Sequence, residues 1–324
     1  MSDPVLDEAI VQAGEGNDLT REQAAAALAV VMAGEAGEEQ IRDLLLALRE
    51  KGETADELAG MAQTMRSMAS EVRPERIDLL DTCGTGGGRQ TFNISTAAAL
   101  VAAGAGCAVA KHGNRTATGL TGSADVRDEL GFGFMFAPAH HAATRHVVPV
   151  RRALGVSTIF NLLGPLTNPA GARRQLIGVW EPGRLDIMAG ALAALGTEHA
   201  MVVSSTDGLD EISIDAPTEA REVRGSSVES VVITPEGLGL TGAAGEVPAG
   251  DPAASAAVIT GVLEGESGPA RAIVLANAAA AIYVSGGAPS IADGMAVAES
   301  SIDSGAARDL LAAYVARTRE LAGR

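Results

Sequence analysis

The pattern of apolar and polar residues divides the chain near Pro74. The first seventy residues predict helices only. Two pairs in this part, Thr20 with Gln23 and Thr54 with Glu57, have the spacing of a capping box, in which two side chains satisfy backbone groups at a helix start. An all-helical segment is therefore expected before the Arg-Pro sequence that ends at Pro74.

From residue 77 onward, short apolar runs of strand length alternate with helical runs. This alternation is typical of a mainly parallel sheet with helices packed on its faces. A hairpin is expected at 223–234, around Gly225. The runs that predict the other strands are 77–80, 107–110, 133–136, 175–180 and 200–204.

Two helical segments between these strands, 139–155 and 158–163, are expected to join the N-terminal helices rather than the sheet. The tail from Pro252 is helical again and ends in an amphipathic stretch, 307–321. A chain of 324 residues favours two domains. The predicted fold class is α/β, with a small all-helical domain and a larger α/β domain that has a mainly parallel central sheet. The expected boundaries are 1–72 with about 139–165 for the helical domain, and 73–138 with 166–324 for the α/β domain.

Glycines crowd together after the first predicted strand, where Gly84, Gly86, Gly87 and Gly88 fall within five positions around Thr85. Glycine permits positive φ and lets a ligand approach the main-chain amides closely. The turn leads into an Ala-rich helix, and the free N–H groups and dipole at a helix start favour an anion. Together these features predict a phosphate site. The polar residues at the helix start are Asn93, Ser95 and Thr96.

The second predicted strand runs directly into KHGNR, residues 111–115. Open α/β sheets bind ligands beyond the carboxyl ends of their strands, so this segment is expected to meet the glycine turn. Lys111 is one of only two lysines in the chain, which makes its place informative. A glycine-rich turn alone is a weak indicator, but together with KHGNR it predicts a ligand that carries several phosphates.

Composition narrows the choice of partners. The formal net charge of −17 argues against nucleic acid or a membrane surface, because an acidic surface repels phosphate polymers. Any phosphate site must therefore be a local positive pocket. Cys83 and Cys107 are too few for a disulfide framework. Without a signal peptide or a long apolar span, a cytoplasmic location is expected.

An acidic loop follows the predicted strand at 200–204, with Asp207, Asp210 and Glu211 in the sequence DGLDE. Adjacent carboxylates on such a loop suit Mg²⁺, which prefers hard oxygen ligands and often shares them with phosphates. The alternative interpretation is a solvated acidic turn, since charged residues are mostly exposed.

Arg151 follows Pro149 and three valines, at 147, 148 and 150, so it is predicted to be partly buried. A buried arginine requires a carboxylate, from the protein or from a ligand. The histidines nearby do not have the spacing of metal ligands, and a solvated helix face is the default interpretation. These histidines are His140, His141 and His146.

Four motifs together resemble the anthranilate phosphoribosyltransferase family: GTGG with TFNIST, KHGNR, FNLLGPLTNP at 160–169, and DGLDE. The resemblance covers nearly the whole chain. It implies a helical domain with an α/β domain of the nucleoside phosphorylase and phosphoribosyltransferase type. It also implies a homodimer that joins anthranilate to 5-phosphoribosyl 1-diphosphate with Mg²⁺, of which two ions are expected.

The resemblance also implies roles for individual residues. Ser95, Asp210 and Glu211 would bind the metal. Anthranilate would be received by Gly84, His112, Asn114, His141 and Arg151. The residues that would bind phosphoribosyl diphosphate are Gly84, Thr85, Gly86, Gly87, Gly88, Thr91, Asn93, Ser95, Thr96, Lys111, Gly119 and Ser123.

Three departures from the family pattern accompany the resemblance. Gly88 stands where the family usually has an aspartate, and the turn to Thr91 is one residue shorter. Gly119 replaces a hydroxyl residue after KHGNR. The join at 130–133 omits a further strand and helix, on the order of eighteen residues. The first two departures bear on diphosphate affinity, and the third on the sheet.

Other classes of protein remain open at this point. A nucleoside phosphorylase would use phosphate as its acceptor and would lack DGLDE. A catalytically impaired relative that only binds, or a phosphoribosyltransferase for another aromatic amine, fits the sequence as well. Product formation from anthranilate and phosphoribosyl diphosphate would separate these alternatives.

Overall fold

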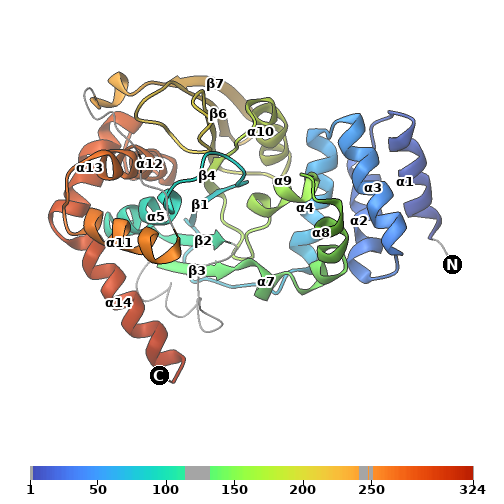
Figure 1. The fold of residues 1–324 in the computed structure, drawn as a ribbon, viewed down its shortest axis with the longest axis horizontal. Helices are drawn as coiled ribbons and strands as arrows, with labels where there is room; N and C mark the ends of the chain where they lie inside the picture. Colours follow the sequence, from blue (N-terminus) through green and yellow to red (C-terminus); the bar gives the residue numbers. More distant parts are fainter. Residues whose placement is uncertain (1–2, 114–131, 241–246, 248–250, 324) are drawn as a thin grey trace.

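The computed structural model describes residues 3–113, 132–240, 247 and 251–323 (Figure 1). Its N-terminal part contains four helices, and both predicted capping boxes are present, at Thr20 and Thr54. Gly34 and Gly52 end the second and third of these helices. The helices are α1 (Pro4–Gly14), α2 (Arg21–Ala33), α3 (Glu38–Lys51) and α4 (Ala55–Met68).

A seven-stranded sheet forms the centre of the described chain, with the order β3-β2-β1-β4-β5-β6-β7. The first five of these strands in the order are parallel, and β6 and β7 add an antiparallel hairpin at one edge. The prediction of a mainly parallel sheet is therefore confirmed. The strands are β1 (Leu80–Gly84), β2 (Val109–Gly113), β3 (Phe132–Phe136), β4 (Arg174–Gly178), β5 (His199–Ser205), β6 (Thr218–Arg224) and β7 (Ser227–Ile233).

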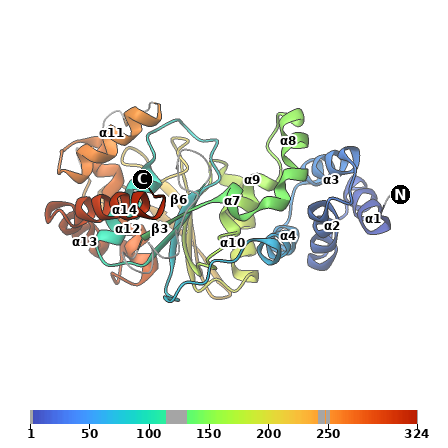
Figure 2. The same cartoon turned by 90° about the horizontal axis from the view of Figure 1, so that it is seen from below.

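Alternate residues of the central strands enter two different hydrophobic clusters. In β5, Met201 packs with the helices on one face, whereas Val202 packs with those on the other. The first face carries α5 (Ile94–Gly104), α12 (Pro269–Ser285), α13 (Ile291–Asp303) and α14 (Ala306–Leu321), with α11 (Pro252–Leu263) beside them (Figure 2). The second face carries α10 (Leu185–Ala194) and, beyond it, the N-terminal helices. The period of two residues in a strand thus builds one core on each face.

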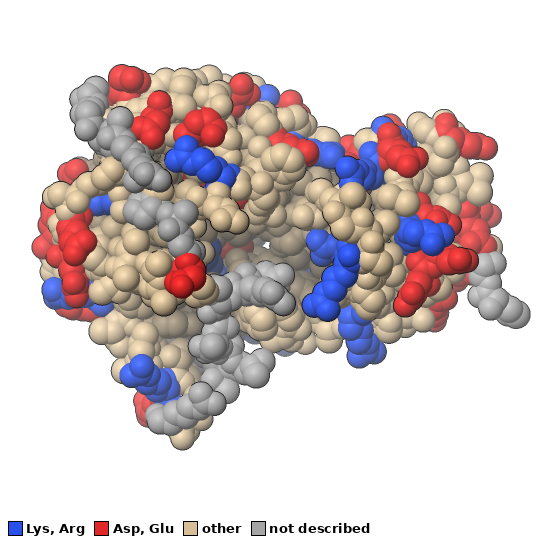
Figure 3. Space-filling model, viewed as in Figure 1, with Lys and Arg blue, Asp and Glu red and all other residues tan. Residues whose placement is uncertain are grey.

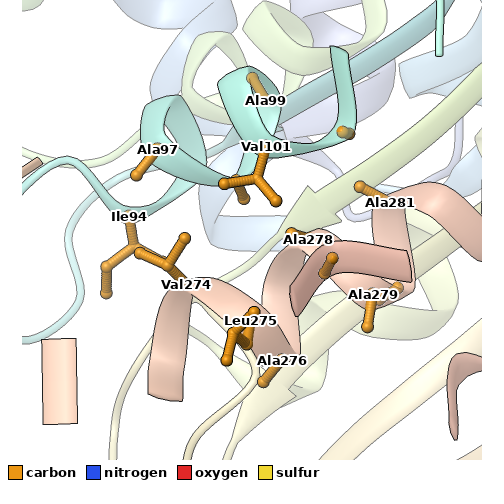
Figure 4. Close-up of a cluster of buried hydrophobic side chains, with 14 of the residues drawn as sticks. Ile94, Ala97, Ala99, Val101, Val274, Leu275, Ala276, Ala278, Ala279 and Ala281 are labelled. Atoms are coloured by element: carbon orange, nitrogen blue, oxygen red, sulfur yellow. The ribbon is translucent and has the colours of Figure 1, made fainter. Parts of the chain in front are cut away.

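Alanine dominates the contact between α5 and α12 (Figure 4). Ala97, Ala99, Ala278 and Ala281 are fully buried there. Small side chains allow the two helices to pack closely, and this packing explains how a chain with only 2% aromatic residues fills its core.

The segment that precedes β4 is broken into short pieces. They are α7 (Ala137–His140), η1 (Ala142–His146), α8 (Val148–Leu154), α9 (Ile159–Leu163) and η2 (Gly164–Leu166). The prediction of one helix over 139–155 was therefore wrong. His141 has φ −115° and ψ 56°, outside the helical region. A new helix begins at Val148, with Pro149, which lacks a backbone N–H, in its first turn. Val147 and Ile159 from these pieces pack in the same cluster as the N-terminal helices.

Two strands begin later than expected. The predicted strand 77–80 is wrong at its start, since Ile77 is 88% exposed and β1 begins at Leu80. The predicted strand 107–110 likewise becomes β2, Val109–Gly113. In both cases polar residues, Asp81 in β1 and Lys111 in β2, belong to the strand because each makes hydrogen bonds with other groups of the protein. The Asp81 carboxylate, for example, accepts the His112 amide at 2.9 Å.

The other strand predictions are confirmed with small shifts. The hairpin turns at Gly225, but β6 begins five residues before the predicted start. β3 pairs with β2 in parallel, so the sheet is continuous at the described side of the shortened join. Short 3₁₀ turns, η3 (Pro182–Arg184) and η4 (Glu236–Leu238), complete the elements. No helix in the described ranges is long and apolar enough to cross a membrane.

Candidate functional site

Three segments converge beyond the carboxyl ends of β1, β4 and β5. The glycine turn after β1 is joined to the end of β4 by the Thr85 amide, which donates to the Gly178 carbonyl at 2.9 Å. Its other end is joined to the acidic loop after β5 by the Arg89 amide, which donates to the Gly208 carbonyl at 3.0 Å. The sequence elements predicted to bind phosphate and metal are therefore in contact.

Close packing explains why glycine occupies several positions here. A Cβ atom on Gly178 would lie 1.7 Å from the Asp210 carbonyl oxygen, so only glycine fits. At Gly88, where the resemblance implied an aspartate in the family, a Cβ atom would lie 3.0 Å from both Asp210 Oδ1 and the Gly208 carbonyl oxygen. The shortened turn thus rests directly on the acidic loop. A side chain at residue 88 would require the acidic loop to shift slightly.

The carboxylates of Asp210 and Glu211 repel each other in a half-buried environment. Burial, followed by the charge of Asp210, raises the pKa of Glu211 to about 8, although Lys111 and the Ser95 amide act in the opposite direction. Burial also raises the pKa of Asp210. Two adjacent acids that resist ionisation fit a divalent cation, which would favour their charged forms. The donor set of hard oxygens fits Mg²⁺.

The start of α5 faces the same region. Asn93 is the N-cap residue, and no side chain caps the helix. Its own amide donates to Ser255 Oγ at 3.0 Å, which ties the start of the helix to α11. Ser95 and Thr96 lie in the first turn, where the free amides and the dipole favour an anion.

Lys111 lies inside β2 and is 4% exposed. Its Nζ atom donates to the Thr82 carbonyl and to Ser95 Oγ, the latter at 3.1 Å. Burial lowers the pKa of this lysine, whereas the charges of Asp81 and Glu211 raise it. Lys111 therefore places its charge beneath the start of α5, between the strand and the acidic loop.

His112 and His141 form a buried aromatic pair, with ring centroids 5.3 Å apart in a T-shaped arrangement. His112 Nδ1 lies 3.1 Å from the Gly164 carbonyl oxygen, and its Nε2 has no hydrogen-bond partner among the described residues. Burial, together with the nearby His141, lowers the pKa of His112 to about 3. The imidazole is thus neutral at physiological pH. It offers an uncharged ring face, and its Nε2 atom has no hydrogen-bond partner among the described residues.

Arg151 on α8 is half-buried, as its apolar neighbours predicted. Its Nη2 atom donates to Asn161 Oδ1 at 3.2 Å, and its guanidinium lies 5.5 Å from the centre of the Phe160 ring. No carboxylate pairs with it in the described parts of the chain. Burial lowers its pKa. An anionic ligand would supply the missing partner.

The structure brings together the glycine turn, the first turn of α5, Lys111 and the acidic pair. Thr91 lies farther along the turn, where its Oγ1 donates to the Phe92 carbonyl at 3.0 Å. Asn114, Gly119 and Ser123 lie outside the described residues. Figure 3 shows a hollow between the two parts of the molecule, with Lys and Arg side chains along its edge on the helical side.

Two residues of this region were missed by reasoning from the sequence. Asp81 is fully buried in β1 and supports His112, and Trp180 lies against Gly87. Two features of the sequence could have indicated them. Asp81 is an acid next to a predicted strand, and Trp180 is the only tryptophan of the chain, two residues beyond β4.

Comparison with family models defines the class of the protein. The model described as "Glycosyl transferase family, a/b domain" matches residues 76–132 and 126–308, and the model described as "Glycosyl transferase family, helical bundle domain" matches residues 7–69. The fold is thus that of this glycosyl transferase family. The two matches of the a/b model overlap at residues 126–132, next to the join at 130–133.

Relatives define the family more narrowly. An anthranilate phosphoribosyltransferase from Anaeromyxobacter sp. (strain K) is 50% identical, and the alignment covers 97% of this chain and 99% of the relative. The alignment spans 334 positions, more than the 324 residues of this chain, so the relative contains residues that this chain lacks. The chain belongs to the anthranilate phosphoribosyltransferase family.

Solved structures agree with this assignment. The anthranilate phosphoribosyltransferase of Thermus thermophilus has a TM-score of 0.87 and 41% identity, covering 96% of this chain and 99% of its own. The Saccharomyces cerevisiae enzyme in complex with 4-fluoroanthranilate has a TM-score of 0.87 and 25% identity, covering 99% of both chains. A variant of that yeast enzyme, solved with Mg bound, has the same TM-score, identity and coverage.

Proposed function

We propose that this protein transfers the phosphoribosyl group of 5-phosphoribosyl 1-diphosphate to anthranilate, with release of diphosphate, in tryptophan biosynthesis. The observation that carries this proposal is the contact between the glycine turn, the start of α5 and the acidic pair at one edge of the sheet. Each of the three suits one part of a metal–diphosphate ligand. The 50% identity to an anthranilate phosphoribosyltransferase supports the choice of acceptor.

The diphosphate would lie on the glycine turn and the first turn of α5. Gly86 and Gly87 have positive φ values of 66° and 100°, which only glycine adopts readily. Amides in such a turn can converge on phosphate oxygens without any side chain. The complete proposed set is Gly84, Thr85, Gly86, Gly87, Gly88, Thr91, Asn93, Ser95, Thr96, Lys111, Gly119 and Ser123.

Mg²⁺ would be held by Asp210, Glu211 and Ser95, and we propose two ions. When bound, Mg²⁺ stabilises the negative charge that develops on the departing diphosphate. The protein prepares this arrangement through Lys111, which lies close enough to lower the pKa of Glu211 and donates a hydrogen bond to Ser95 Oγ. The two acids, Asp210 and Glu211, therefore lie near one buried cation, Lys111, in the protein without ligand.

Anthranilate would be received on the other side of the turn by Gly84, His112, Asn114, His141 and Arg151. The guanidinium of Arg151 has no carboxylate partner in the described ranges, so it suits the anthranilate carboxylate, with which it can form two parallel hydrogen bonds. The neutral rings of His112 and His141 suit the apolar face of the acceptor.

The reaction breaks the bond between ribose C1 and the diphosphate oxygen and forms a bond from C1 to the anthranilate nitrogen. The lone pair of that nitrogen attacks, and one of its protons is lost to solvent. The amine is already neutral near pH 7, so no strong general base is required. Orientation by Arg151 supplies much of the advantage, because it converts an encounter of two molecules into a reaction within one complex.

The helical part of the molecule would close the site against water. Arg184, which follows β4, pairs with Glu53 between α3 and α4. Arg66 Nε on α4 donates to the Leu166 carbonyl at 2.6 Å. These contacts hold the helical part against the sheet and help protect the diphosphate from hydrolysis.

We further propose a helical domain formed by 1–72 with about 139–165, and an α/β domain formed by 73–138 and 166–324. The proposal includes a homodimer in the cytoplasm. Neither nucleic acid nor membrane is a proposed partner, since the net charge of −17 disfavours both.

The test is a direct assay with purified protein, anthranilate, phosphoribosyl diphosphate and Mg²⁺. Anthranilate fluorescence should fall with time, and the fall should stop when phosphoribosyl diphosphate or Mg²⁺ is omitted. No turnover with anthranilate, but turnover with another aromatic amine, would reassign the acceptor. Binding of phosphoribosyl diphosphate without turnover of any amine would identify a catalytically impaired relative instead.

A further inference from the structure

Trp180, the only tryptophan of the chain, lies against the glycine turn. A Cβ atom built on Gly87 would be 2.9 Å from both Cδ1 and Nε1 of Trp180. The edge of the indole therefore fills the space in which a side chain at residue 87 would stand. Since Gly87 has φ +100°, the backbone presses against the ring in a conformation that favours glycine.

The two ends of the turn are held by main-chain hydrogen bonds, and the indole supports its middle. The Thr85 amide is bonded to Gly178, and the Arg89 amide is bonded to Gly208. Trp180 follows Gly178 by two residues, so the strand that anchors one end of the turn also delivers the ring. The position of Trp180 is therefore set by β4 rather than by the turn itself.

Trp180 also faces the helical part of the molecule. It lines a cavity of about 10 Å³ with Glu53, Asn161 and Arg184, which leaves room for one water at most. Trp180 is 37% exposed. A movement of the turn or of the helical part would therefore change the surroundings of the ring.

We propose that Trp180 is a positioning residue, which holds the Gly86 and Gly87 amides in the arrangement that receives the diphosphate group. This inference rests on the proposed function. The turn contains three glycines in succession, Gly86, Gly87 and Gly88, so few side chains are available to hold it. A rigid aromatic ring supplies contact area at a small loss of conformational entropy.

The first test measures binding of phosphoribosyl diphosphate with Mg²⁺ by calorimetry. Trp180→Ala is expected to raise the Kd about tenfold, and Trp180→Phe about threefold, since phenylalanine keeps a planar ring. The KM for anthranilate should change less than twofold in both variants. Val232→Ala is the matched control, because Val232 is 64% exposed on β7 and should change neither constant.

The second test uses the fluorescence of the single tryptophan in the wild-type protein. Titration with phosphoribosyl diphosphate and Mg²⁺ should change the emission saturably, with a midpoint equal to the calorimetric Kd. Gly87→Val should abolish this change, because a side chain at residue 87 meets the ring. A saturable change that persists in Gly87→Val would place the ligand elsewhere and overturn the inference.

The outcomes separate this inference from the proposed function. Turnover of anthranilate with an unchanged Kd in Trp180→Ala would overturn the positioning role and leave the function intact. Saturable emission changes without turnover would leave the positioning role intact and remove the proposed reaction. An equal rise of both substrate constants in Trp180→Phe would mean that Trp180 has only a general structural role.

Discussion

The two lysines of the chain are both buried, but their surroundings differ. Lys51, at the end of α3, lies 2.7 Å from Asp18 Oδ1 and 3.0 Å from Glu57 Oε2, and its side chain is 3% exposed. Burial acts to lower its pKa, but the hydrogen bonds and charges of these two acids outweigh burial and raise it. Lys111 donates only to a carbonyl and a hydroxyl in the described structure, and burial lowers its pKa.

The difference separates a charge that the protein itself satisfies, that of Lys51, from the charge of Lys111, for which a ligand is proposed. In the helical part, the charge of Lys51 is satisfied by the protein, and Glu57 also accepts the Leu19 amide at 2.8 Å. In the site, the charges of Lys111, Asp210 and Glu211 lie near one another without direct ion pairs between them in the described structure. Such an arrangement costs stability in the free protein, and a bound cation and diphosphate would relieve that cost.

The largest expected effect comes from removing the acidic pair. Asp210→Asn combined with Glu211→Gln should lower kcat by about a thousandfold or more, because the metal loses its carboxylates. The melting temperature should stay within a few degrees, since the variant removes two acids that repel each other. Asp215→Asn, on an exposed residue after the loop, is the control. Full activity of the double variant, or of the wild type in excess chelator, would contradict the metal assignment.

Replacing each lysine by methionine tests the comparison directly. Lys111→Met should lower kcat by about a hundredfold, as loss of one fixed electrostatic group does, and should cost about 1 kcal/mol of stability or less because Asp81 can take up a proton. Lys51→Met should cost about 3 kcal/mol, because Glu57 is left buried without its cation, and kcat should barely change. Urea unfolding and steady-state kinetics measure both. An equal loss of unfolding free energy in Lys51→Met and Lys111→Met would contradict the difference between the two lysines.

Arg151 is a second cation without a carboxylate partner among the described residues, and it lies on the proposed acceptor side of the site. Arg151→Ala should raise the KM for anthranilate about tenfold or more, and should change that for phosphoribosyl diphosphate much less, because one charged hydrogen bond is lost. Arg151→Lys should recover part of the loss, since lysine lacks the planar pair of donors. Arg152→Ala, on the exposed neighbour, is the control. Equal damage to both substrate constants would indicate a structural arginine.

The smallest effect concerns His112, a neutral group beside these charges. Its pKa of about 3 lies below the ordinary value of 6.5, so the unfolded chain binds its proton first as the pH falls. The stability from His112 is therefore complete above about pH 6.5 and is lost as the pH falls toward 3. In His112→Gln, unfolding free energy should depend less on pH between 6.5 and 3. An NMR titration of the wild-type ring between pH 5 and 8 would refute this if it showed a midpoint.

Local patterns in the sequence were sufficient for much of the fold. The capping boxes at Thr20 and Thr54, the alternation of strand and helix, and the turn at Gly225 all depend on residues a few positions apart. The limits of β1 and β2 could not be predicted in this way. Asp81 and Lys111 interrupt the apolar pattern, and only their partners in neighbouring elements allow them to remain in strands.

The sequence by itself determined the α/β class, the glycine turn, the acidic loop and the partly buried Arg151, since each has a signature of composition or spacing. Only the tertiary structure decided that Gly88 packs on Asp210 and that Trp180 lies against Gly87. It also decided that, among the described residues, Lys51 has carboxylate partners and Lys111 has none. These features join residues from different strands and helices. Their geometry depends on the register of β1, β4 and β5 in the sheet, and no local pattern encodes the distance between side chains that the sheet brings together.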